Sequence, residues 1–422
     1  MYAGIYREYH TAWIISSNLL KDMATIKSFR AIQPNPFYAD QLVFPGDEQV
    51  FFFGINAKEH PPVPLKDQLE TPARHRPETE EGQQRAYEQI RESLQKLLDN
   101  GRLWKEKVPG IYIYEIVHRN YRQTGVWALT AVKDFTEGQI KLHELTLADS
   151  ERRIASYRKN TGLEGSPVLL TYEPTIEINR IIAETCAGNK KTTIGNKKSL
   201  HRIWKIEDQN TLDQLIAAFA KLERVYMADG HHRLAGTDRL GDEYISSLFI
   251  ASDQLRIIDY YRVVVPTEPI HENILLEKLG KSFRIFPSTK PVKPNFPHMI
   301  GMCMGGNWYE LVANDTTKLD VLLLQEEVLA PIFKITDPRN DYQLKCIGGE
   351  TAMEETIAFL GQNPTAIAFT LCPISVKALI NAADSNTILP PKSTWIDPKV
   401  PYGLLLFQHK IEQETISDHH YD

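Results

Sequence analysis

Short β-rich runs, separated by turn residues and by segments with helical spacing, constrain the fold of this chain most strongly. The runs 111–117 and 125–133 flank a polar turn and predict a β-hairpin. Further strands are predicted over 166–172, 201–206, 225–228, 246–252 and 257–265. Apolar residues recur at intervals of three and four in predicted helices over 78–98, 151–160 and 211–222. This alternation predicts a mixed α+β fold built on a mixed sheet.

The chain has 422 residues, which is too many for one ordinary hydrophobic core and predicts two domains. Pro266 marks a boundary, so we expect a core over 23–265 and a second α+β lobe over 266–422. Met23 opens a typical cytoplasmic start, and residues 1–22 are therefore expected to be an upstream extension without an assigned function. The polar segment 183–199 is predicted to be a loop.

Composition excludes several classes of protein. The formal net charge of −6 argues against a general nucleic-acid surface, and no apolar run is long enough to span a bilayer. The cysteines are too widely spaced for a zinc motif and are typical of free thiols in a reducing compartment: Cys186, Cys303, Cys346 and Cys372. We therefore expect a cytoplasmic protein that binds neither membranes nor nucleic acid.

The sequence VYMADGHHRLAG predicts a buried strand that ends at Asp229 and Gly230 and leads into a helix. The glycine permits a tight turn, and the free backbone N–H groups at a helix N-terminus favour an anion. Arg233 adds a bidentate donor for phosphate. His231 and His232 are adjacent, so their side chains diverge on a helix and a shared metal ion is not expected. In the alternative interpretation, Asp229 caps the helix and the histidines lie at the surface.

The segment LHELTLADSERR places Glu144 beside His143 at the exit of a strand. A carboxylate in that position can act as a general base, with the histidine orienting it. The same residues also fit a solvated turn in which Glu144 pairs with Arg153 on the surface. The residues alone do not separate these two interpretations.

A third polar segment, LPPKSTWIDPKV, contains no Walker A pattern. It carries side chains that suit phosphate, namely Lys392, Ser393, Thr394 and Lys399. A proline-stiffened loop with solvated lysines is the alternative. Arg262, within YYRVVVP, is a weaker candidate for further positive charge.

The segments IKSFRAI, HELT, SPVLLTY, HRIWKI, ADGHHR, DPRND and PPKSTW occur in one order along the chain. This order resembles a widespread prokaryotic family, domain of unknown function ten-fifteen, over residues 25–408. A more distant resemblance links the HE pair and the DGxHR-type turn to free serine kinases of the ParB/sulfiredoxin superfamily. In this sequence the matching residues are His143 with Glu144, and Asp229 to Arg233.

The remote resemblance implies a ParB/sulfiredoxin-like core and phosphoryl transfer to free L-serine, giving O-phosphoserine. It implies pyrophosphate, ADP or ATP as the donor, and we expect Mg²⁺ as the cofactor. Glu144 is then expected to accept the serine proton, with His143 orienting it and Asp229 holding the metal. The donor phosphates would be bound by Gly230, His231, His232, Arg233, Lys392, Ser393 and Thr394. Further positive charge would come from Arg153, Arg262 and Lys399.

Two alternatives remain from the sequence. The same turn could serve a non-catalytic sensor of nucleotide or phosphate, which would bind its ligand without forming a product. The chain could also run the chemistry in reverse and consume phosphoserine.

Overall fold

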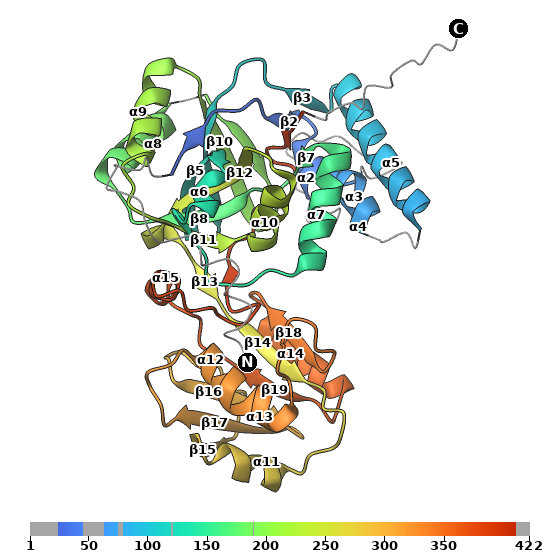
Figure 1. Ribbon diagram of the computed structural model, residues 1–422, viewed down its shortest axis with the longest axis vertical. Helices are drawn as coiled ribbons and strands as arrows, with labels where there is room; N and C mark the ends of the chain where they lie inside the picture. The colour runs from blue at the N-terminus through green and yellow to red at the C-terminus, as the bar shows by residue number, and fades with distance from the viewer. Residues whose placement is uncertain (1–23, 45–62, 75–78, 120, 189, 411–422) are drawn as a thin grey trace.

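A computed structural model describes residues 24–44, 63–74, 79–119, 121–188 and 190–410. The chain forms two lobes that meet at a narrower junction (Figure 1). The predicted extension over 1–22 lies outside the described residues. No helix among the described residues is both long enough and apolar enough to cross a membrane.

A mixed sheet forms the centre of the first lobe, with the strand order β6-β11-β8-β12-β5-β4-β10-β9 and β1 paired to β5. The β6–β11 and β8–β12 pairs are parallel, and the other pairs are antiparallel. Its strands are β1 (Ile26–Lys27), β4 (Ile111–His118), β5 (Tyr121–Ala131), β6 (Ile140–Lys141), β8 (Val168–Tyr172), β9 (Thr192–Gly195), β10 (Ser199–Ile206), β11 (Val225–Asp229) and β12 (Tyr244–Ala251).

Hydrophobic clusters cover both faces of this sheet. One cluster packs strand residues against helices α8 (Ile176–Ala187), α9 (Gln209–Phe219) and α10 (His231–Leu240). On the other face, Phe29 near the N-terminus and Leu404 near the C-terminus join the core. The remaining elements of this lobe are α2 (Ala39–Val43), α3 (Leu65–Leu69), α4 (Thr71–Arg74), α5 (Glu80–Asp99), α6 (Lys133–Thr136), α7 (Ala148–Thr161), η1 (Ser252–Gln254), and the strand pairs β2 (Ile32–Pro34) with β3 (Leu103–Lys105) and β7 (Leu163–Glu164) with β21 (Phe407–Gln408).

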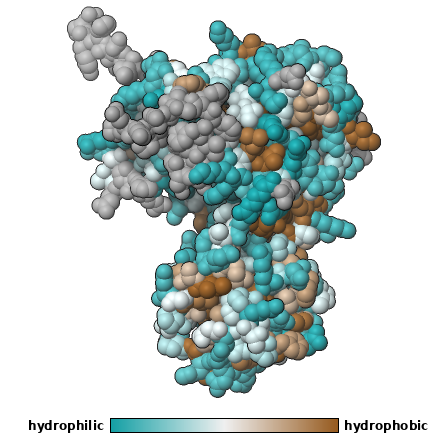
Figure 2. All heavy atoms as spheres, turned by 180° about the vertical axis from the view of Figure 1, so that it is seen from behind, coloured by the Kyte–Doolittle hydropathy of each residue, from teal (hydrophilic) through white to brown (hydrophobic). Residues whose placement is uncertain are grey.

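The second lobe contains an antiparallel sheet of order β15-β17-β16-β19-β14-β18. Its strands are β14 (Tyr260–Val264), β15 (Phe283–Ser288), β16 (Met299–Met304), β17 (Asn307–Ala313), β18 (Leu344–Gly348) and β19 (Ile367–Thr370). Its helical segments are α11 (Glu272–Leu279), α12 (Asp320–Leu324), the π-helical turn η2 (Gln325–Leu329), α13 (Ala330–Phe333), α14 (Ala352–Gln362) and α15 (Val376–Asp384). From behind, the surface of this lobe is mixed, with small separate apolar patches (Figure 2).

The predicted α+β fold with a second α+β lobe is confirmed, but the chain changes lobes earlier than residue 265. Strand β14 belongs to the second sheet, and the preceding β13 (Ile257–Ile258) pairs with β20 (Trp395–Ile396). The C-terminal strand β21 then returns to the first lobe. The predicted loop over 183–199 is wrong, because it contains the end of α8 and all of β9.

Candidate functional site

The ADGHHR segment forms the predicted strand, turn and helix. Strand β11 ends at Asp229, and Gly230 has a φ of +104°, in the left-handed region that favours glycine. An added Cβ on Gly230 would lie 2.8 Å from an Arg233 guanidinium nitrogen and 3.0 Å from the Val168 side chain. Asp229 does not cap the helix, because Gly230 is the N-cap and no side chain accepts a capping bond. The first N–H groups of α10 therefore remain available to an anion.

Both carboxylate oxygens of Asp229 contact cations. Oδ2 accepts a hydrogen bond of 2.9 Å from Arg233, and Oδ1 accepts one of 3.1 Å from Lys399 Nζ. Burial raises the pKa of this carboxyl, but the charges of Arg233 and Lys399 overcome that effect and hold it well below its usual range. Each oxygen of Asp229 thus already has one cationic partner, and a metal ion here would share the carboxylate with Arg233 and Lys399. The predicted Mg²⁺ ligand role of Asp229 stays a prediction.

Glu144 is half-buried and follows β6. Its backbone forms a bridge with Leu389, which brings it to the segment that returns from the second lobe. Burial raises the pKa of the Glu144 carboxyl to about 7, although the charge and backbone N–H of Lys392 oppose the shift. The alternative of a surface pair with Arg153 is wrong, since no such ion pair joins these two described residues.

Three histidines lie beneath and beside this turn. The rings of His143 and His231 meet edge to face, with their centroids 4.6 Å apart and their planes at 89°. Burial lowers the pKa of His143 to about 4 and that of His231 well below its usual value, so both are neutral. Burial and the charge of Lys392 also lower the pKa of the half-buried His232. No hydrogen bond joins His143 to Glu144 among the described contacts. No direct contact therefore supports the predicted role of His143 in orienting Glu144.

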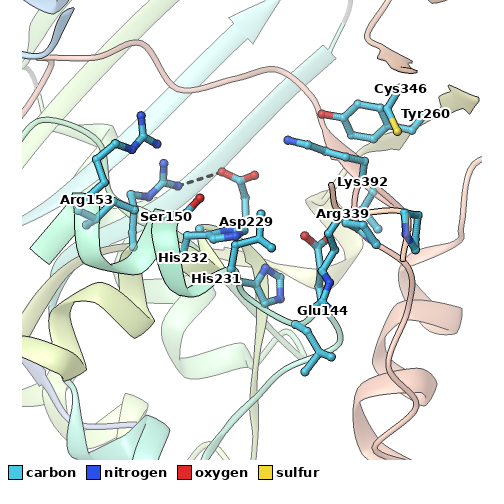
Figure 3. Close-up of a pocket in the computed structure, with 18 of the residues that line it drawn as sticks. Glu144, Ser150, Arg153, Asp229, His231, His232, Tyr260, Arg339, Cys346 and Lys392 are labelled. Atoms are coloured by element: carbon cyan, nitrogen blue, oxygen red, sulfur yellow. Dashed lines mark hydrogen bonds and ion pairs between the residues drawn. The ribbon is translucent and has the colours of Figure 1, made fainter. Parts of the chain in front are cut away.

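A cavity of about 720 Å³ lies over the turn. Figure 3 shows Ser150 and Arg153 on one side, Tyr260, Cys346 and Lys392 on the other, and Asp229, His231 and Glu144 between them. The site residues predicted from the sequence that line it are Glu144, Arg153, Asp229, Gly230, His231, His232, Arg233, Lys392 and Thr394. The cavity is therefore lined by both lobes.

Four of the predicted site residues do not line this cavity. His143 is fully buried behind it, and the Ser393 hydroxyl is buried and donates to the Pro390 carbonyl. Arg262 is also buried and donates to the Pro391 carbonyl at 3.0 Å, so it holds the loop that carries Lys392. Lys399 reaches Asp229 from beside the cavity and lies over the ring of Trp395.

The sequence interpretation missed several residues of the wall. Helix α7 supplies Ser150 and packs closely on α10, where an added Cβ on Gly236 would lie 2.9 Å from the Ile154 side chain. The second lobe supplies Tyr260 and Lys345. No local pattern marks these residues, because their position depends on how the two lobes meet.

Comparison with known proteins gives the family. The model described as "Protein of unknown function (DUF1015)" matches residues 68–332. No curated protein matches the sequence.

The solved structures that match this chain share little sequence identity with it. A conserved hypothetical protein from Pyrococcus furiosus is 13% identical, with a TM-score of 0.40, over 68% of this chain and 96% of that one. A free serine kinase in complex with AMP is 13% identical, with a TM-score of 0.41, over 68% of this chain and 92% of that one. SbnI with a C-terminal truncation, from Staphylococcus aureus, is 16% identical, with a TM-score of 0.39, over 66% of this chain and 87% of that one.

Proposed function

This chain belongs to the DUF1015 family of proteins of unknown function, and we propose that it is a kinase that transfers a phosphoryl group to the hydroxyl of free L-serine. One observation carries the proposal. Glu144 and the turn from Asp229 to Arg233 lie far apart in the sequence but line the same cavity, together with Lys392. A carboxylate and an anion-binding turn facing one space are the two parts that phosphoryl transfer to an alcohol requires.

The turn and its surroundings suit the phosphates of a donor such as pyrophosphate, ADP or ATP. The N-terminus of α10 has no side-chain cap, and its first residues line the cavity, where the positive end of the helix dipole favours an anion. Six cationic side chains line the wall: Arg74, Arg153, Arg233, Arg339, Lys345 and Lys392. A protein with a formal net charge of −6 thus gathers positive charge where an anionic donor would bind.

Glu144 would serve as the general base. The serine oxygen attacks the terminal phosphorus of the donor, and its proton passes to the Glu144 carboxylate. The bond from that phosphorus to the bridging oxygen breaks, and the remaining phosphate or nucleotide leaves with the bonding electrons. The pKa of about 7 leaves Glu144 about half ionised near neutral pH, which suits a base that must both accept and release a proton.

Mg²⁺ enters this proposal as part of the substrate, because donor phosphates carry it into kinase sites. Arg233 and Lys399 contact the two oxygens of Asp229, and we therefore assign this carboxylate a different role from direct metal binding. Asp229 instead holds Arg233 against the turn. It thereby keeps a bidentate donor in place beside the phosphate site.

The test is to incubate the purified full chain with L-serine and Mg²⁺, using pyrophosphate, ADP and ATP in separate reactions. O-phosphoserine is measured by mass spectrometry and by ³¹P NMR. We expect product with at least one donor, and a loss of about 10²–10⁴-fold in kcat for Glu144→Gln. Asp238→Asn is the matched control, because Asp238 is an exposed carboxyl on α10 that lies outside the cavity. Donor binding without product in all three reactions overturns the kinase proposal and supports a sensor.

A further inference from the structure

His143, Glu144 and His231 form a cluster that the proposed reaction does not fully use. Each offers one ligand atom, and these three atoms lie within 4.8 Å of one another. Two of the residues follow β6, and the third is the first residue of α10. His231 and His232 cannot share one metal ion on a helix, because their side chains diverge. The fold supplies another histidine from 88 positions earlier in the sequence.

Three ring nitrogens of this cluster are buried without a hydrogen-bond partner among the described residues. His143 has a relative exposure of 0% and His231 of 6%. These three atoms are Nδ1 and Nε2 of His143 and Nε2 of His231, and none has a hydrogen-bond partner of normal geometry among the described residues. The Met227 backbone lies close to His143. Buried polar atoms are normally paired, because leaving one without a partner costs about 1–3 kcal/mol. Two such imidazoles beside a carboxylate therefore require an explanation.

We propose that His143, Glu144 and His231 bind a divalent transition-metal ion of the Zn²⁺, Mn²⁺ or Fe²⁺ class. Neutral imidazole nitrogen is a preferred ligand of these ions, whereas Mg²⁺ prefers oxygen ligands. Two histidines and one carboxylate leave coordination positions open. Glu144 and His231 line the cavity, so an ion held by these three residues would border it.

The bound ion would regulate the proposed kinase, and this part of the inference rests on the proposed function. A carboxylate that coordinates a cation is a much weaker proton acceptor than a free one. Metal at this cluster would convert Glu144 from base to ligand and inhibit transfer to serine. The Mg²⁺ that accompanies the donor would not compete, because it binds imidazole poorly.

The binding test needs neither serine nor donor. Metal-free full-length protein is titrated with Zn²⁺ by calorimetry and with Co²⁺ by visible absorption, where coordinated imidazole gives characteristic bands. We expect one ion per chain, and binding weakened by at least about tenfold in His231→Gln and Glu144→Gln. His232→Gln is the matched control, because this neighbouring histidine lies outside the cluster. A stoichiometry of zero overturns the site, as does equal weakening by the His231 and His232 substitutions.

His143→Gln adds a third measurement if circular dichroism shows that this variant folds, and the other two variants suffice if it does not. Inhibition is then measured in the serine assay with Mg²⁺ fixed and Zn²⁺ varied. Wild-type protein should lose activity at the Zn²⁺ concentration that fills the site, while His231→Gln should resist inhibition by at least about tenfold. Zn²⁺ binding without inhibition overturns the regulatory part. If no serine kinase activity exists at all, the binding experiment still decides the metal site.

Discussion

The pKa of Glu144 gives a prediction that distinguishes a catalytic role of this residue from a purely structural one. A carboxyl with a pKa of about 7 is about one tenth ionised at pH 6 and about nine tenths ionised at pH 8. A base works only when ionised, so kcat/KM for serine should rise with pH through about 7. The increase from pH 6 to pH 8 should be about tenfold.

Lys392 allows the same pKa to be moved. Its charge is the largest effect that opposes burial at Glu144. Lys392→Met removes this charge while keeping the length of the side chain and its backbone N–H. An opposite charge at 4–6 Å lowers a carboxyl pKa by about 1–3 units, so we expect a shift of about one unit upward. At pH 7 this change would lower the ionised fraction of Glu144 by about fivefold, and activity would recover at higher pH.

The assay is the rate of O-phosphoserine formation from pH 5.5 to 9.5 at saturating donor, which separates the pKa effect from weaker donor binding. The exposed Asp238→Asn variant should keep the wild-type profile. A flat profile between pH 6 and 8 would refute Glu144 as the base. An unchanged midpoint in Lys392→Met would show that the lysine does not tune this carboxyl.

Three further substitutions test the geometry of the turn and its loop. Gly230→Ala should lower the free energy of unfolding by about 2 kcal/mol, because its φ of +104° is unfavourable for alanine and the new Cβ would crowd Arg233; an unchanged urea midpoint contradicts this. Arg233→Ala should lower kcat/KM for the donor by an amount equivalent to about 2–4 kcal/mol, and wild-type kinetics would exclude its contact with the transferred charge. Ser393→Ala should lower the free energy of unfolding by about 1 kcal/mol and leave kcat/KM unchanged, because its buried hydroxyl donates to Pro390. A large loss of activity would show that Ser393 takes part in the site.

The sequence predicted the parts of the site that local rules govern. A buried strand, a glycine and a helix start were sufficient to place Asp229 to Arg233 at a strand-to-helix turn, because each step depends only on nearby residues. The direction of a side chain in a loop depends instead on distant parts of the chain that pack against that loop. Lys392 and Ser393 are neighbours of similar polarity, yet one lines the cavity and the other is buried against its own loop.

The same distinction explains why the sequence did not predict strand β9 or the contact between His143 and His231. The predicted loop over 183–199 was polar, but β9 lies at the edge of the sheet, where a strand needs fewer apolar residues. Helical spacing predicts only that the neighbouring side chains of His231 and His232 diverge, and it says nothing about residues elsewhere in the chain. Spacing could not reveal His143, whose ring meets His231 only because β6 and β11 pair side by side.

The two lobes cannot be treated as independent units with a boundary at residue 265. The chain crosses the junction at β13 and returns at β20, and these two strands pair with each other. The returning segment then supplies the two lysines that act on the site carboxylates, Lys392 near Glu144 and Lys399 on Asp229. The same segment continues into the core of the first lobe, where Leu404 is fully buried. A chain ending at residue 265 would therefore lack both site lysines and would lose the C-terminal part of the core on one face of the first sheet.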